Sequence, residues 1–200
     1  MIKNIIFDIG RVLLEFNPKQ YIQEKYNDSL LTEELHSAIF GSSEWLDLDK
    51  GTITDEEAIE IFTKRHTGRE THIAEIMNGW HHILIPLDGT VKLLERLKQK
   101  GFKIILLSNF HLKAFDMIYE KYSFLKLADE MIISSKINLL KPHKEIYEYM
   151  LKSLDLTAEE CLFIDDTLVN VEGAEKLGIN AIQFENPELL EKELKNLSLL

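Results

Sequence analysis

The segment Ile-Ile-Phe-Asp-Ile-Gly at residues 5–10 decides the fold class, because a short apolar run ends there in an aspartate and a glycine. Residues 2–8 predict a buried parallel strand, since strands covered on both faces read as apolar runs. Four later segments are equally short and rich in β-forming residues, and they span residues 102–108, 130–134, 161–164 and 180–184. The chain therefore contains five candidate strands.

Helical patterns separate these strands. They cover residues 90–100, 112–121, 144–154, 170–177 and 187–197, and glycines 101 and 178 stand where helix C-caps belong. Strands and helices in alternation predict an α/β fold, a Rossmann-like doubly wound parallel sheet covered by helices on both faces.

Residues 16–82 interrupt the alternation with several helical patterns and no convincing buried strand. Within them, Thr54 and Glu57 predict a capping box at the start of a helix. An insertion of this length is too long for a simple crossover helix, so we expect a small α-helical cap inserted after strand one. The Rossmann-like core would then comprise residues 1–15 and 83–200.

Composition and charge exclude several functional classes. The 200 residues are 45% hydrophobic, and 34 acidic against 23 basic residues give a formal net charge of −11, which argues against nucleic-acid or anionic-membrane partners. No segment approaches the roughly 20 apolar residues of a membrane span. The single cysteine excludes an internal disulfide, and the N-terminal apolar stretch is too short for a signal peptide, so we expect a cytoplasmic protein. A monomer and a homodimer fit the sequence equally well.

Polar residues follow the predicted strands at their carboxyl ends, where ligands bind to open parallel sheets. They are Asp8, Ser108, Asn109, Lys141, Asp165 and Asp166. Three neighbouring carboxylates need a cation to offset their repulsion, and oxygen ligands suit Mg²⁺. An aspartate neutralised in this way can attack phosphorus while Ser108 and Lys141 hold the phosphoryl oxygens. This chemistry would form an aspartyl-phosphate.

These residues lie in four segments whose order and spacing resemble the motifs of the haloacid dehalogenase-like hydrolase superfamily. The segments are FDIGRVL at 7–13, LLSN at 106–109, LLKPHKEIY at 139–147 and FIDDTLVNVEGAEKLGI at 163–179. Each motif alone is weak, but four in order over nearly the whole chain are specific. The resemblance is to the branch with a helical cap after motif one, which is similar to bacterial sugar phosphatases such as α-D-glucose-1-phosphate phosphatases.

The resemblance implies which residues would handle the substrate. Asp8 would be the nucleophile, and Lys141 would neutralise charge between it and the phosphate. Ser108 and the backbone of Asn109 would bind the phosphoryl group. Arg11 is unusual at its position and would reach a second anionic group or the cap.

The resemblance also implies the metal ligands. Asp8 and Asp166 would bind Mg²⁺ directly, and Gly10 would contribute only its backbone carbonyl. Asp165 would be either a further ligand or an acid that orients a metal-bound water.

Gly10 departs from the family pattern, in which a second aspartate two residues after the nucleophile is the general acid and base. Three explanations stay open. The leaving group needs little protonation, as in a sugar 1-phosphate; another group such as Glu15 substitutes; or the protein is a weak catalyst. The similarity to sugar 1-phosphate phosphatases favours the first.

Other polar and aromatic residues have simpler interpretations. The acidic stretch 31–60 predicts a solvated helical face, and Trp45 and Trp80 predict cap core rather than a substrate platform. His111 and His143 follow motifs two and three closely enough to line the site.

The sequence thus predicts a Mg²⁺-dependent phosphatase of a small phosphorylated metabolite, with a sugar phosphate preferred. A metal-free 2-haloacid dehalogenase is disfavoured because Asp165 and Asp166 are both present. A phosphomutase is disfavoured by Gly10. A non-catalytic phosphometabolite-binding module remains the alternative of a different class.

Overall fold

A five-stranded parallel sheet forms the centre of the protein in the computed structural model, which describes all residues from Met1 to Leu200. The strands are β1 (Asn4–Phe7), β2 (Lys103–Ser108), β3 (Glu130–Ile133), β4 (Cys161–Asp165) and β5 (Asn180–Gln183), in the order β3-β2-β1-β4-β5. The first strand therefore lies between β2 and β4, where the strand order reverses. The predicted α/β Rossmann-like fold is confirmed.

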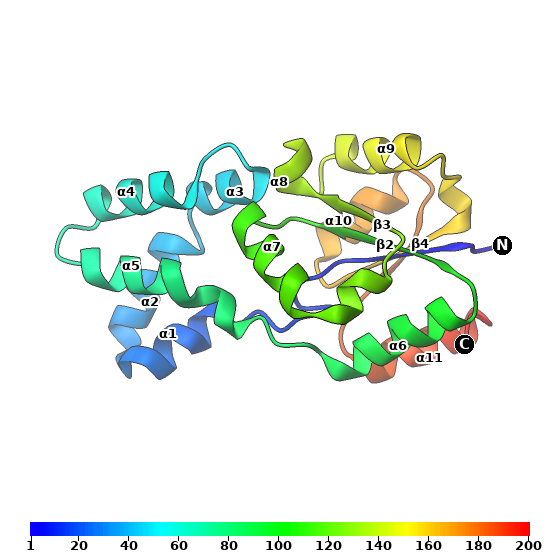
Figure 1. Ribbon diagram of the computed structural model, residues 1–200, viewed down its shortest axis with the longest axis horizontal. Coiled ribbons are helices and arrows are strands. Elements are labelled where there is room, and N and C mark those ends of the chain that lie inside the picture. Colours follow the sequence, from blue (N-terminus) through cyan, green and yellow to red (C-terminus); the bar gives the residue numbers. More distant parts are fainter.

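Helices cover both faces of this sheet (Figure 1). One face packs against α6 (Asp88–Gln99), α7 (Leu112–Lys121) and α11 (Pro187–Asn196), and the other against α9 (Lys144–Ser153) and α10 (Leu168–Glu175). The five predicted strands and five predicted core helices are confirmed, with ends that differ by at most two residues. The shorter elements are η2 (Ser123–Leu127), α8 (Ser134–Ile137) and η3 (Ala158–Glu160).

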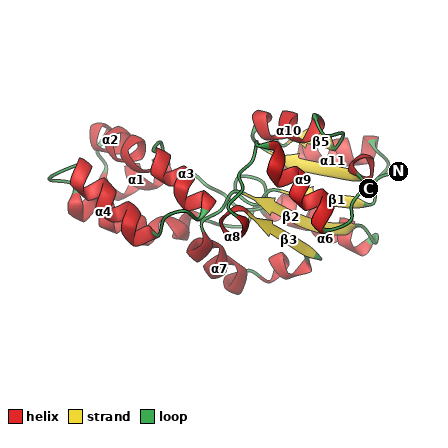
Figure 2. Cartoon of the chain, turned by 90° about the horizontal axis from the view of Figure 1, so that it is seen from above, coloured by secondary structure: helices red, strands yellow, loops and turns green.

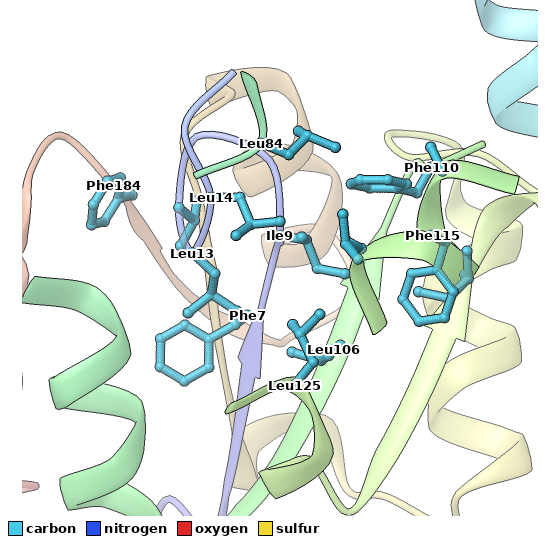
Figure 3. Packing of buried hydrophobic residues seen from close by; sticks show 14 of the residues in the cluster. Phe7, Ile9, Leu13, Leu14, Leu84, Leu106, Phe110, Phe115, Leu125 and Phe184 are labelled. Carbon is cyan, nitrogen blue, oxygen red and sulfur yellow. The ribbon is translucent and has the colours of Figure 1, made fainter. Parts of the chain in front are cut away.

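The loop that follows β1 is packed into the hydrophobic core through Ile9, Leu13 and Leu14 (Figure 3). Ile9, Leu13 and Leu14 are fully buried in the cluster that contains Phe7 of the strand. The backbone N–H groups of Leu13 and Leu14 both donate to the carbonyl of Ile9 at 2.9 Å. The chain thus leaves the sheet in a tight, packed turn.

The insertion forms helices only. They are α1 (Pro18–Tyr26), α2 (Ser29–Ile39), α3 (Ser43–Lys50), α4 (Asp55–Arg65), α5 (Glu70–Gly79) and the 3₁₀ helix η1 (Trp80–Ile83), called the insertion helices below. The capping box of Thr54 and Glu57 is confirmed at the start of α4. Figures 1 and 2 show α1 to α5 gathered at one end of the molecule, away from the two termini. The division into a core and a cap at residues 16 and 82 stays a prediction.

A close contact between the end of α3 and α8 joins the insertion helices to the sheet and its covering helices, called the sheet domain below. Ser134 Oγ donates a hydrogen bond to the carbonyl of Asp49, and Asn138 Nδ2 donates to the carbonyl of Lys50 at 2.8 Å. Gly51 caps α3 with φ +73°, and a Cβ there would lie 2.4 Å from the carbonyl oxygen of Ser135. Glycine is needed at this position both for its backbone conformation and for the close approach.

None of the helices combines the length and the hydrophobicity that a membrane crossing requires.

Replacing Gly51 by alanine is expected to lower the free energy of unfolding, because the new Cβ would collide with backbone atoms that cannot rotate away. The control is Gly68→Ala, which has a similar φ of +85° but no atom within 4 Å of the Cβ position. We expect Gly51→Ala to lose about 1–3 kcal/mol more than this control in urea titrations. Equal losses would show that the left-handed backbone alone sets the cost.

Candidate active site

A cavity of about 360 Å³ lies where the carboxyl ends of β1, β2 and β4 meet the insertion helices. The predicted residues that line it are Asp8, Gly10, Arg11, Asn109, Lys141 and Asp166. Ser108 and Asp165 are buried at 1% and 0% exposure and contact the lining residues from behind. The sheet order thus brings all the predicted site residues together.

Lys141 is buried at the centre of this group. Its Nζ lies 2.9 Å from Asp8 Oδ1 and 2.6 Å from Asp165 Oδ2, and it donates a hydrogen bond to the carbonyl of Leu107 at 3.0 Å. Burial alone would lower the pKa of Lys141, but the two carboxylates outweigh burial and raise the pKa above its usual value. The ammonium group is therefore charged.

One carboxylate oxygen of Asp8 accepts hydrogen bonds, and the other is free to bind a ligand. Its Oδ1 accepts hydrogen bonds from Ser108 Oγ at 2.6 Å and from the backbone N–H of Ile9 at 2.7 Å, in addition to the ion pair with Lys141. Burial raises the pKa of Asp8 to about 6, Lys141 opposes this shift, and Asp165 adds to it. Because these donors converge on Oδ1, Oδ2 is the oxygen available to a ligand.

Asp165 is fully buried, and both of its oxygens accept hydrogen bonds. Thr167 donates its backbone N–H at 2.9 Å, and Asn170 Nδ2 lies 3.0 and 3.2 Å from the two oxygens. With Lys141 Nζ also bound, Asp165 holds the ammonium group rather than facing the cavity. Sequence reasoning missed Asn170, although its amide lies five residues after Asp165 in the same motif.

Asp166 faces the cavity, with a side chain that is 20% exposed. Burial and then the neighbouring Asp165 raise its pKa. Oxygen atoms of Asp8, Asp165 and Asp166 all lie within 4.8 Å of one another. The donor set is entirely oxygen and carries more negative charge than Lys141 offsets, which fits a hard divalent cation such as Mg²⁺.

The side chains of two residues, Asn109 and Arg11, hold the surrounding loops. The amide of Asn109 pairs with the backbone of Lys141 in both directions, at 2.9 and 3.0 Å. Arg11 has φ +57°, donates from Nε to the carbonyl of Phe16 at 3.2 Å, and places Nη1 3.7 Å from Asp166. Arg11 therefore lies at the edge of the cavity and contacts the first residues of the insertion.

A side chain would fit at position 10, because a Cβ on Gly10 would have no other atom within 4 Å. Glu15 is exposed and does not line the cavity, so the hypothesis that it replaces the missing acid is not supported. His143 is also exposed and outside the cavity, and the expectation that it lines the site is wrong.

Aromatic residues in the insertion helices and just before α1 form one wall of the cavity. Phe16, Trp45 and Trp80 line the cavity, with the Phe16 ring stacked 6.2 Å from Trp45 and edge-on 5.9 Å from Trp80. The two tryptophans are 8% and 4% exposed. They are therefore buried, as predicted, and they also face the ligand space, which the sequence did not indicate.

Asp49 of α3 and His111, which follows β2, also line the cavity. The Asp49 side chain is only 14% exposed, so the interpretation of residues 31–60 as a solvated face is wrong at this position. Burial, and then the charge of Asp8, raise the pKa of Asp49 to about 8, against an opposing effect of Lys141. Burial lowers the pKa of His111 to about 3, so its ring is neutral.

Replacing Asp49 by asparagine is expected to reduce the pH dependence of stability in metal-free protein. Folding raises the pKa of Asp49 to about 8 from an unfolded value of about 3.9. The native state therefore retains a proton that the unfolded state releases, and this carboxyl lowers wild-type stability as pH rises from about 4 to about 8. Between about pH 5 and about pH 8, urea titrations should show Asp49→Asn gaining on the order of 2 kcal/mol over wild type.

The control for that prediction is Asp47→Asn, the same substitution on the same helix at a position that does not line the cavity. Parallel pH curves for wild type and Asp49→Asn would contradict the prediction.

Curated relatives match the chain at low identity over most of its length. The sesquiterpene phosphatase astK of Aspergillus oryzae is 27% identical over 98% of this chain and 96% of its own, and the D-ribitol-5-phosphate phosphatase of Bacteroides thetaiotaomicron is 26% identical over 93% of each. The drimenol cyclase drtB of Aspergillus calidoustus is 27% identical over 98% of this chain, which spans only 37% of that protein.

Solved structures share the fold. One is the haloacid dehalogenase (HAD) family enzyme bt-2542 from Bacteroides thetaiotaomicron, solved with magnesium and inorganic phosphate. It superposes on this chain with a TM-score of 0.72 at 21% sequence identity, and the match covers 93% of this chain and 96% of that one. The family model described as haloacid dehalogenase-like hydrolase matches residues 2–178. The chain belongs to the haloacid dehalogenase-like hydrolase family.

Proposed function

We propose that the protein is a Mg²⁺-dependent phosphatase that hydrolyses a small phosphorylated metabolite through an aspartyl-phosphate on Asp8. The observation that supports this most directly is the buried Lys141 ammonium group held between Asp8 and Asp165. This arrangement places a fixed positive charge beside a carboxylate whose second oxygen is open. The family and the relatives named as phosphatases support the same reaction class.

The reaction has two steps. The open oxygen of Asp8 forms a bond to phosphorus while the bond from phosphorus to the leaving oxygen breaks. Ser108 and Lys141 already converge on Asp8, so their donors lie where the phosphoryl oxygens arrive. Water then attacks the phosphorus of the aspartyl-phosphate, which releases phosphate and restores the Asp8 carboxylate.

The same residues would hold Mg²⁺. Asp8 and Asp166 would be direct ligands together with the backbone carbonyl of Gly10. Asp165 would orient its neighbours, because its oxygens already accept hydrogen bonds from Lys141, Asn170 and Thr167. When bound, the ion would neutralise phosphate charge so that the Asp8 carboxylate can approach phosphorus.

A sugar phosphate is the proposed substrate class, because a cavity of about 360 Å³ with an aromatic wall accommodates a single ring. The same wall of Phe16, Trp45 and Trp80 also fits a prenyl phosphate, and the similarity to a sesquiterpene phosphatase makes that the second candidate. Comparison of kcat/KM across a panel of sugar phosphates and prenyl phosphates distinguishes the two. A cytoplasmic location stays a prediction.

Hydrolysis of p-nitrophenyl phosphate is expected to require Mg²⁺ and to fall on the order of 10³-fold or more in Asp8→Asn. The phenolic leaving group needs little protonation, so the glycine at position 10 should not conceal activity. Circular dichroism checks the fold of the variant. Turnover that survives in Asp8→Asn would refute the mechanism, and no turnover in folded, Mg²⁺-binding wild type would favour the binding-module alternative.

Mg²⁺ is expected to stabilise the protein. At about 100 times its Kd the ion should add about 2.7 kcal/mol, which corresponds to about 5–10 °C in Tm for a chain of this size. Asp166→Asn should lose most of this shift in differential scanning fluorimetry. Asp116→Asn on α7, which does not line this cavity, should keep it. A full shift in Asp166→Asn would exclude this residue as a ligand.

A further inference from the structure

The proposed reaction needs a group that protonates the leaving oxygen, and Gly10 cannot supply one. Three carboxyl groups line the cavity, those of Asp8, Asp49 and Asp166. Asp8 is the proposed nucleophile, and Asp166 is a proposed metal ligand. Asp49 is therefore the one carboxyl group in the cavity that the proposed reaction leaves without a role.

Asp49 is held in place from the sheet domain. Its carbonyl accepts the hydrogen bond from Ser134 Oγ, and Ser134 Oγ in turn accepts from the backbone N–H of Phe110 at 2.9 Å. The next two residues, Lys50 and Gly51, pack against α8. The Asp49 side chain thus enters the cavity from a backbone fixed to the sheet domain, although α3 belongs to the insertion.

His111 lies beside Asp49. Its Nε2 is 3.2 Å from Asp49 Oδ1, and its ring packs 4.2 Å from Trp45 and 5.2 Å from Trp80. The residue is only 2% exposed, and neither ring nitrogen has a well-aligned hydrogen-bond partner. Buried polar atoms without partners are costly, which points to a partner supplied by a ligand or by a proton on Asp49.

The two sides of the cavity have opposite chemistry. The sheet side holds Lys141 and the aspartate cluster, where phosphate would bind. In an in-line attack by Asp8, the leaving oxygen points away from the nucleophile, toward the insertion side of the cavity. Asp49 enters the cavity from α3 of the insertion, and His111, which follows β2, lies 3.2 Å from it.

We propose that Asp49 is the general acid and base of this site, that His111 is its positioning residue, and that the pair replaces the aspartate absent at position 10. This assignment rests on the proposed phosphatase function. As Asp8 bonds to phosphorus and the ester bond breaks, the Asp49 carboxyl proton passes to the leaving oxygen, giving an alcohol. The Asp49 carboxylate then takes a proton from the water that attacks the aspartyl-phosphate, and Asp8 and phosphate are released.

The charges around Asp49 agree with this cycle. Burial and the facing Asp8 carboxylate favour the protonated form, while Lys141 opposes it and neutral His111 adds no charge. In the metal-free protein a pKa of about 8 keeps the proton on Asp49 at neutral pH. An acid needs such a value to donate near its operating pH.

The test compares two leaving groups in wild type, Asp49→Asn and the control Asp47→Asn. A general acid matters for a sugar alkoxide and matters little for p-nitrophenolate, and acid–base catalysis contributes about 10²–10⁴-fold. The ratio of kcat/KM for the best sugar phosphate to that for p-nitrophenyl phosphate should fall on the order of 10²-fold in Asp49→Asn. It should stay at the wild-type value in Asp47→Asn.

Introducing the family's aspartate at position 10 tests whether the activity lost in Asp49→Asn can be recovered. The Cβ position of Gly10 is free of contacts, so Gly10→Asp should fit and should recover on the order of 10-fold or more of that ratio in the Asp49→Asn background. An unchanged ratio in Asp49→Asn, with both substrates slowed equally or not at all, would overturn the assignment and leave Asp49 a structural role.

A second measurement does not depend on turnover. Infrared spectra of metal-free protein at neutral pH should show a protonated-carboxyl band that is lost in Asp49→Asn and retained in Asp47→Asn. Identical bands in wild type and Asp49→Asn would overturn the assignment. Failure of the proposed function itself is distinguishable, because wild type would then show no Asp8-dependent turnover of either substrate.

Discussion

The buried ammonium group of Lys141 is the interaction on which the site depends. A buried charge costs several kcal/mol unless it is paired and hydrogen-bonded, and here each partner comes from the end of a different strand. Asp8 follows β1, Leu107 lies in β2 and Asp165 ends β4, at 2.9, 3.0 and 2.6 Å from Nζ. Only a sheet with β1 between β2 and β4 places these three oxygens around one point, so the strand order and the site require each other.

The site is also divided between two parts of the chain with different tasks. The sheet domain contributes the charges, and these are fixed by short, local hydrogen bonds such as that of Ser108 to Asp8. The insertion contributes the aromatic wall and Asp49, which depend on packing between distant segments. Because Asp8, Lys141 and Asp165 are buried, their charges act in a low dielectric, where a single carboxyl can shift its pKa far from the usual value.

This division explains what the sequence could predict. The strands and Asp8, Ser108 and Asp165 were predictable because each of these polar residues lies at or just beyond the end of an apolar strand, and parallel strands end at one edge. Lys141 follows β3 only after α8, so its role was predicted from the resemblance of LLKPHKEIY to a family motif. Asp49 was not predictable, because its burial depends on a hydrogen bond from Ser134, which lies 85 residues away. Local composition predicted an exposed Asp49, since this residue lies in an acidic stretch whose other members are mostly solvated.

The proposed position of the acid has a consequence for the enzyme. An aspartate at position 10 would sit on the same rigid loop as the nucleophile and would be present whether or not the insertion is docked. An acid at position 49 reaches the cavity only when α3 contacts α8 through Ser134 and Gly51. Proton delivery to a poor leaving group then requires this contact, whereas attack by Asp8 on a good leaving group does not. The insertion would thus couple closure of the cavity, which excludes water, to the proton transfer that a sugar phosphate needs.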